Sequence, residues 1–96
     1  MSYLYILFSL KLNKFYTGSC LNLKQRLSDH KNKTHTNSFT KVTDDWELYF
    51  EMKELDFVIV RKIEDYIKSM KSKKYIENLK KYPEIAKKLI SKFYDL

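Results

Sequence analysis

The chain has 96 residues, with 19 lysines and arginines against 12 aspartates and glutamates, which gives a net charge of +7. Its 44% hydrophobic and 16% aromatic content excludes intrinsic disorder, and its length suits a single domain. A single cysteine excludes an internal disulfide and a cysteine-rich zinc module. The positive charge is typical of proteins that bind an anionic partner, most often nucleic acid.

The chain begins with a predicted β-hairpin. Residues 3–8 are aromatic and aliphatic throughout, which is typical of a buried strand. A polar turn follows at 11–14, in which Asn13 tolerates the left-handed conformation. Residues 15–17 are predicted to form a second strand that ends at Gly18, the only glycine of the chain. The simplest pairing of the two strands is antiparallel.

A short helix is predicted after the hairpin. Asn22 is expected to cap it, with Gln25 completing a capping box. Arg26 and His30 are four residues apart and therefore share one face of the helix. Residues 31–43 are rich in Lys, Asn, Thr and Ser and are predicted to form a mobile basic loop.

The second half of the chain is predicted to contain one strand and three helices, so the fold class is α+β. The strand covers Trp46–Met52, and a helical period begins near Leu55, with Glu64 at the edge of its apolar face. Ser72 is expected to cap a further helix, and Pro83 lies in the first turn of the last one, where proline is favoured. The apolar positions of these helices are Leu55, Val58, Ile59, Ile63, Tyr66, Ile67, Met70, Tyr75, Ile76, Leu79, Ile85, Leu89, Ile90 and Phe93.

Several common catalytic signatures are missing. One glycine is too few for a P-loop, a dinucleotide-binding fingerprint or a nucleophile elbow. Cys20 is expected to be a small core residue rather than a nucleophile. His30 and His35 lack the spacing and the partners of a zinc site.

Five polar residues remain on apolar elements, and each has a structural interpretation. His30 would be a surface side chain. Tyr5 and Tyr16 would pack in the strands with their hydroxyls reaching water. Arg26 would be an exposed helix charge, and Glu64 would pair with Lys68 four residues later. Their order and spacing favour a functional interpretation of the whole set.

The motifs that carry this interpretation resemble those of the GIY-YIG nuclease family, in particular its small stand-alone bacterial branch. They are Tyr3-Leu4-Tyr5, Tyr16-Thr17-Gly18, residues 22–26 with His30 following, residues 64–68 and residues 70–76. The resemblance runs from about Tyr3 to Leu79. Tyr3 replaces the first glycine of the family name, and Thr17 replaces the usual Ile or Val.

This resemblance implies a three-stranded antiparallel sheet flanked by helices over residues 1–82, with residues 83–96 as an added helix packed on the same domain. It implies a metal-dependent DNA endonuclease of low sequence specificity, with structure selectivity for branched or flapped DNA left open. Glu64 would hold one divalent cation, Mg²⁺ or alternatively Mn²⁺, without a small-molecule cofactor.

The other site residues take their roles from the same resemblance. Arg26 would grip the scissile phosphate, Tyr5 would take a proton from the attacking water, and Tyr16 would position water or phosphate. A neighbouring arginine and metal ion would favour the phenolate that such a base needs. His30 would assist as a phosphate ligand or proton relay. Gly18 is interpreted as a position where a side chain would crowd the phosphate or the turn into the helix.

Lysines are expected to bind backbone phosphates without reading sequence, namely Lys24, Lys31, Lys33, Lys68, Lys71, Lys73 and Lys74. An alternative is a nucleic-acid-binding module that has the fold without efficient catalysis. A weaker one is docking of the lysine-rich helices on an acidic protein or membrane surface. No apolar stretch is long enough for a membrane span and no signal peptide is recognised, so we expect a cytoplasmic monomer or weak homodimer.

Overall fold

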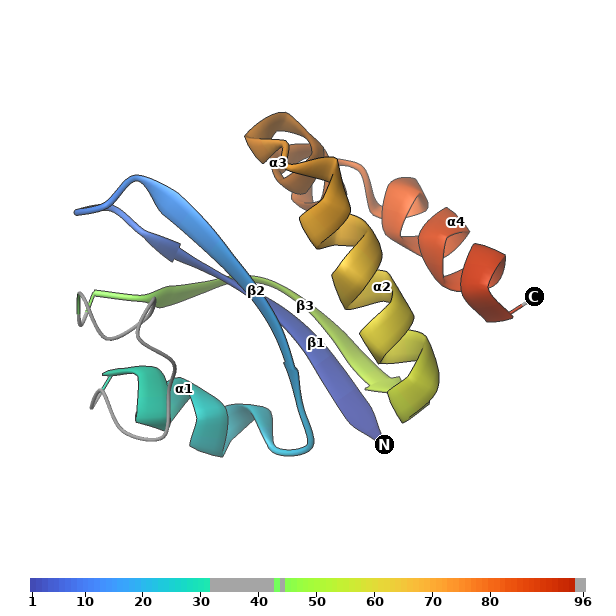
Figure 1. The fold of residues 1–96 in the computed structure, drawn as a ribbon, viewed down its shortest axis with the longest axis horizontal. Helices are drawn as coiled ribbons and strands as arrows, with labels where there is room; N and C mark the ends of the chain where they lie inside the picture. The colour runs from blue at the N-terminus through green and yellow to red at the C-terminus, as the bar shows by residue number, and fades with distance from the viewer. Residues whose placement is uncertain (32–42, 44, 95–96) are drawn as a thin grey trace.

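The computed structural model describes residues 1–31, 43 and 45–94, with residues 30 and 31 described by their backbone alone. Its elements are, in order, β1 (Ser2–Ser9), β2 (Lys14–Cys20), α1 (Leu23–Lys31), β3 (Glu47–Leu55), α2 (Phe57–Met70), α3 (Lys73–Lys81) and α4 (Pro83–Tyr94) (Figure 1). The strands form an antiparallel sheet in the order β2-β1-β3. The predicted α+β fold with a three-stranded antiparallel sheet is therefore confirmed.

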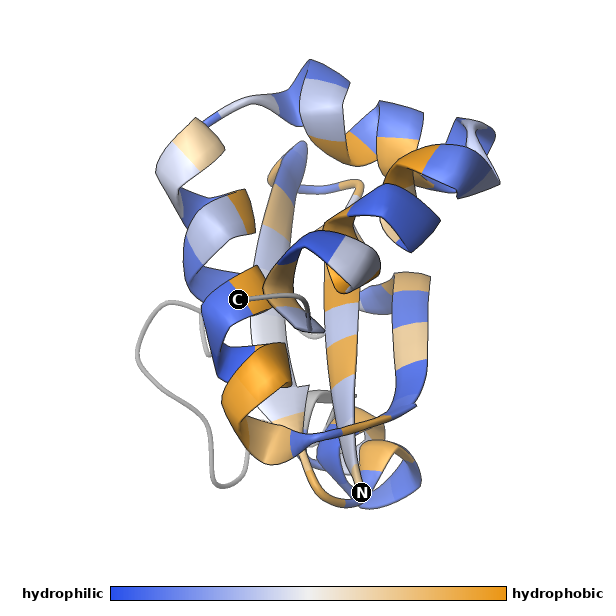
Figure 2. Ribbon diagram, turned by 90° about the vertical axis from the view of Figure 1, so that its right-hand side faces the viewer, coloured by the Kyte–Doolittle hydropathy of each residue, from blue (hydrophilic) through white to orange (hydrophobic). Residues whose placement is uncertain are grey.

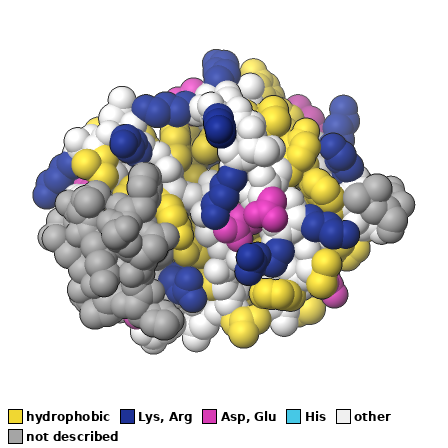
Figure 3. Space-filling view, in the orientation of Figure 1, with side chains coloured by type: hydrophobic (Ala, Val, Ile, Leu, Met, Phe, Trp, Pro, Cys, Tyr) yellow, Lys and Arg dark blue, Asp and Glu magenta, His cyan; other side chains and the backbone are white. Residues whose placement is uncertain are grey.

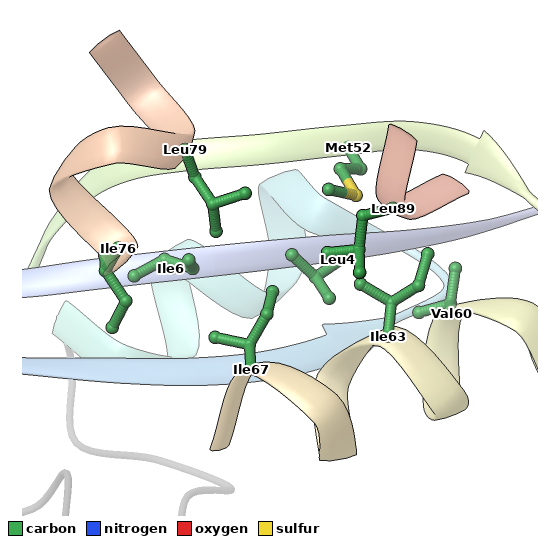
Figure 4. Packing of buried hydrophobic residues seen from close by; sticks show 9 residues of the cluster. All are labelled: Leu4, Ile6, Met52, Val60, Ile63, Ile67, Ile76, Leu79 and Leu89. Atoms are coloured by element: carbon green, nitrogen blue, oxygen red, sulfur yellow. The ribbon is translucent and has the colours of Figure 1, made fainter. Parts of the chain in front are cut away.

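Strand β1 lies at the centre of the sheet and is buried on both faces. Leu4 and Ile6 pack against α2, α3 and α4, and Figure 4 shows them among the side chains of these helices. Tyr5 and Leu7 point to the opposite face, where α1 packs. This arrangement explains why β1 is hydrophobic throughout rather than alternating. Figure 1 shows α1 apart from the other three helices, across the sheet.

The local sequence signals for turns and caps are mostly confirmed. Asn13 has a φ of 52°, in the left-handed region. Asn22 accepts a hydrogen bond from the backbone N–H of Gln25, and Ser72 caps α3. The Gln25 side chain donates to Asp29 instead of closing the predicted capping box. Pro83 is the first residue of α4, as the sequence predicts.

Three predicted boundaries are wrong. Strand β2 continues past Gly18 to Cys20, because its pairing with β1 extends to Tyr3. Trp46 precedes β3 and is buried with Tyr5 and Cys20. Helix α2 begins only after Asp56, whose side chain accepts from the N–H of residue 58. Most of the predicted loop at 31–43 lies outside the described residues.

Helix α4 packs on the same core as α2 and α3. Its Leu89 is buried in the main cluster, and Ile85, Ile90 and Phe93 are partly buried against that cluster. Figure 2 shows hydrophobic and hydrophilic residues alternating around these helices. The predictions for Val58 and Met70 are wrong, since both are exposed at the ends of α2. No helix in the described ranges is long and apolar enough to cross a membrane.

Candidate active site

The candidate residues lie around β2, which is an edge strand of the sheet. Residues directly opposite each other on paired strands share a face. Tyr16 and Gly18 are opposite Leu7 and Tyr5, so they face α1. Ser19 is opposite Leu4 and therefore faces α2. Strand β2 thus presents one group of functional side chains on each of its two faces.

Gly18 makes room for the ring of Tyr5. A Cβ atom at this glycine would lie 2.5 Å from the Tyr5 Oη and 2.7 Å from its Cζ. The glycine does not have a positive φ, so the close approach of the ring, and not backbone conformation, requires it. The prediction that Gly18 ends a strand is wrong, since β2 continues to Cys20. The role of Gly18 toward the phosphate or the turn stays a prediction.

The Tyr5 hydroxyl is buried beside the half-buried side chains of Arg26 and Tyr16. Tyr5 is 1% exposed and accepts a hydrogen bond from the Arg26 side chain. The Tyr5 and Tyr16 ring centroids are 6.3 Å apart. Burial raises the pKa of Tyr5, and Tyr16 adds to the increase, whereas Arg26 opposes it. Burial dominates, so Tyr5 is a protonated phenol at neutral pH.

Cys20 faces the same side as Tyr5. It is buried in the α1-facing cluster, and that burial raises the pKa of its thiol despite the neighbouring Arg26. A raised pKa makes a thiol a poor nucleophile at neutral pH. This supports the interpretation of Cys20 as a core residue.

Glu64 lies on α2, facing the other side of β2. It is 8% exposed, and its carboxylate accepts hydrogen bonds from the Ser19 Oγ at 2.7 Å and the Lys68 Nζ at 2.6 Å. The Arg61 Nε is 3.9 Å from the same carboxylate. Figure 3 shows acidic side chains near the middle of this face with basic ones on either side. The predicted pair of Glu64 with Lys68 is thus present.

The donor set around Glu64 fits a hydrated cation. Within the described ranges, no three Asp, Glu, His or Cys side chains gather as a full protein cage would require. Mg²⁺ commonly takes one or two carboxylates and fills its other positions with water and substrate phosphate. A carboxylate has about four lone-pair sites, so Glu64 can bind a cation while Ser19 continues to donate to it.

A cleft joins the two faces at the end of β2. It has a volume of about 410 Å³ and is lined by the start of α1, including Arg26, and by the start of α2, including Phe57 and Arg61. Ser19, the hydrogen-bond partner of Glu64, also lines it. Both arginines of the chain therefore face one concave surface beside the buried carboxylate.

The structure brings together most but not all of the predicted site residues. Tyr5, Tyr16, Gly18 and Arg26 form one group, and Glu64 lies across β2 from it. Lys68, Lys71 and Lys73 line a second pocket, whereas Lys24 and Lys74 are exposed on α1 and α3. The structure does not describe Lys33 or the side chains of His30 and Lys31, so the predictions for these three residues lie outside the described part of the chain.

Sequence reasoning missed Ser19 and Arg61. Ser19 follows Gly18, and strand alternation alone would place it on the opposite face from Tyr16. Arg61 lies three residues before Glu64, so helical spacing would place it beside that carboxylate. Both patterns are visible in the sequence, but only the position of β2 beside α2 shows that the two residues belong to one site.

Comparison with known proteins gives one match. A family model, the GIY-YIG catalytic domain, matches residues 1–82. No curated protein and no solved structure matches the chain. The matched range contains the whole sheet, the first three helices and every residue of the cleft. Because this range covers most of the chain, the protein belongs to the GIY-YIG family of nuclease domains.

Proposed function

We propose that the protein is a divalent-metal-dependent DNA endonuclease that hydrolyses phosphodiester bonds with low sequence specificity. The observation that carries this proposal is the buried Glu64 carboxylate beside a cleft that contains Arg26 and Arg61. A chain with net charge +7 attracts the DNA backbone without selecting bases.

The two arginines bind the phosphate. Arg26 already donates to Tyr5, and its planar guanidinium has further donors for the oxygens of a phosphate. Arg61 lines the same cleft from α2. Fixed donors in a partly buried site stabilise the charge that develops on a phosphoryl group more strongly than water does.

Glu64 would hold the metal ion, with its free carboxylate lone pairs as the ligand. A bound Mg²⁺ or Mn²⁺ supplies Lewis-acid polarisation of the phosphoryl oxygen. Ser19 fixes the orientation of the carboxylate by its hydrogen bond. Lys68 neutralises Glu64 in the absence of metal and becomes available to a phosphate when its partner binds a cation.

In this proposal the base is the fraction of Tyr5 that has lost its proton to solvent, and its phenolate Oη takes a proton from the attacking water and becomes the phenol again. Arg26 stabilises that phenolate, but burial holds the pKa of Tyr5 above its ordinary value, so the phenolate is the minor form at neutral pH. A base with a raised pKa is deprotonated in a fraction that grows with pH, so the cleavage rate should rise through and above the neutral range. Tyr5→Phe should flatten this rise.

The test is nicking of supercoiled plasmid by the purified chain in Mg²⁺ or Mn²⁺, with EDTA as the blank. Glu64→Gln should lower the rate by at least about 10³-fold, since it removes the metal ligand. Asp65→Asn is the matched control, because Asp65 is an exposed carboxylate on the same helix. No metal-dependent nicking, or equal rates for Glu64→Gln and the wild type, would overturn the proposal.

A second candidate is a nucleic-acid-binding module without catalysis. Ser19 and Lys68 pair both oxygens of Glu64, which would satisfy a purely structural carboxylate. This alternative predicts salt-sensitive DNA binding that survives Glu64→Gln and Arg26→Ala, with no nicking by the wild type.

A further inference from the structure

A second concave site adjoins the candidate active site. It is a pocket of about 430 Å³ between β2, the end of α2 and the start of α3, with Phe15, Ile67 and Ile76 among its apolar lining residues. This volume is within the range of about 300–1,000 Å³ that is usual for small-molecule sites. Figure 3 shows hydrophobic side chains bordered by basic ones on this face.

Lysines surround the apolar lining, but they are not equally available to a ligand. Lys68 is paired with Glu64, and Lys73 donates to the Asn13 carbonyl at 2.6 Å. The Lys71 ammonium lines the pocket and has no acceptor within the described residues. The backbone of Lys71 has a φ of 47°, which is unfavourable for residues other than glycine. Lys71 is therefore a cation that a ligand can engage.

The combination of an apolar lining and cations narrows the class of ligand. An inorganic anion would leave the apolar surface unused, and an uncharged hydrophobic ligand would leave the cations unpaired. A nucleotide has both a flat base and a phosphate, and proteins bind unpaired strands with such a pairing of stacking surface and positive charge. Charge and shape complementarity thus favour a nucleotide.

We propose that this pocket binds one unpaired nucleotide of the DNA substrate, with its base on Phe15 and Ile76 and its phosphate at Lys71. The inference rests on the proposed function. Lys68 lines the pocket and donates a hydrogen bond to Glu64, so the bound nucleotide lies next to the cleaved bond. A base inside a duplex would first have to unstack, and this costs least where the base is already unpaired. The protein therefore selects DNA with an unpaired nucleotide beside the cut.

Binding in EDTA tests the pocket separately from cleavage. Three fluorescent DNA duplexes are compared by anisotropy: one fully paired, one with a single unpaired thymidine, and one with an abasic residue at that position. The wild type should bind the thymidine duplex at least about fivefold more tightly than the abasic one, which is the lower end of what stacking of one base contributes. Equal affinity for these two would overturn the inference.

Two variants assign the effect to the pocket. Phe15→Leu should reduce the preference for thymidine over the abasic residue to less than about twofold, with abasic binding unchanged. Lys71→Gly should weaken thymidine-duplex binding about fivefold without loss of thermal stability, because glycine favours its left-handed conformation. Lys87→Ala, on α4 outside the pocket, is the control for loss of charge. An effect of Lys87→Ala as large as that of Lys71→Gly would contradict the assignment.

The outcome also separates this inference from the proposed function. Base-dependent binding without any nicking in Mg²⁺ would keep the pocket and refute the catalytic proposal. Normal nicking with equal binding of all three duplexes would refute the pocket alone. Absence of DNA binding together with absence of nicking would refute both.

Discussion

Gly18→Ala should separate the rate of cleavage from the binding of DNA. The new Cβ would lie 2.5 Å from the Tyr5 Oη, whereas ordinary contact begins near 3.4 Å, so the hydroxyl must move by about 1 Å. Displacement of a catalytic group by this distance costs about 10²-fold in rate. Overpacking costs about 1–3 kcal/mol, partly offset by about 0.5–1 kcal/mol because alanine suits a strand better than glycine.

The assay is a double-mutant cycle on the rate of plasmid nicking. Tyr5→Phe removes the hydroxyl that Gly18→Ala displaces, so Gly18→Ala should add almost no further loss of rate in that background. The affinity for duplex DNA in EDTA should change by less than about twofold in every variant, and circular dichroism should show that each one is folded.

Two results would refute this reasoning. One is an equal loss of rate from Gly18→Ala in both backgrounds, since the glycine would then act independently of Tyr5. The other is a loss of DNA affinity as large as the loss of rate. That result would be expected if Gly18 made room for the phosphate, as the sequence alone suggested.

Three further predictions concern stability and metal binding. The Asp45 carboxylate accepts from Ser9, and this hydrogen bond in particular lowers its pKa from 3.8 to about 2. Its stabilising effect is therefore present above about pH 4 and is lost as the pH falls toward 2, so the thermal midpoint should fall less over this range in Asp45→Asn than in the wild type. Leu89→Ala should lower the free energy of unfolding in urea by about 2–4 kcal/mol in one transition, because Leu89 is 5% exposed within the shared core. Lys68→Met should raise the affinity for Mn²⁺ about three- to tenfold by electron paramagnetic resonance, because the ammonium 2.6 Å from Glu64 competes with the cation.

Each of these predictions has a contradicting result. Parallel pH curves for Asp45→Asn and the wild type would remove Asp45 from the acid transition. A separate early transition in Leu89→Ala would show that α4 unfolds independently of the domain. Unchanged or weaker Mn²⁺ binding by Lys68→Met would mean that the ion binds away from Glu64.

The sequence predicted caps and turns correctly where they depend on contacts between residues close together in the chain. The Ser72 cap, the Asn13 turn and Pro83 at the start of α4 depend on contacts within four residues, and the sequence shows these directly. The third strand and α2 were misplaced at their boundary, since Leu55 fits the apolar face of a helix as well as the inward face of β3. Pairing of Leu55 with Ser2 of β1 decides in favour of the strand.

The sequence by itself determined the fold class and the family resemblance, because motif order and helical or strand periodicity are properties of the linear chain. The roles of the site residues stay predictions. Assignment to the small stand-alone branch stays a prediction. Only the tertiary structure decided what surrounds those residues. Gly18 is opposite Tyr5 through cross-strand register, and Ser19 donates to Glu64 across 45 positions of sequence. Such contacts depend on how β1 pairs with β2 and how α2 packs on the sheet, and no local pattern specifies either.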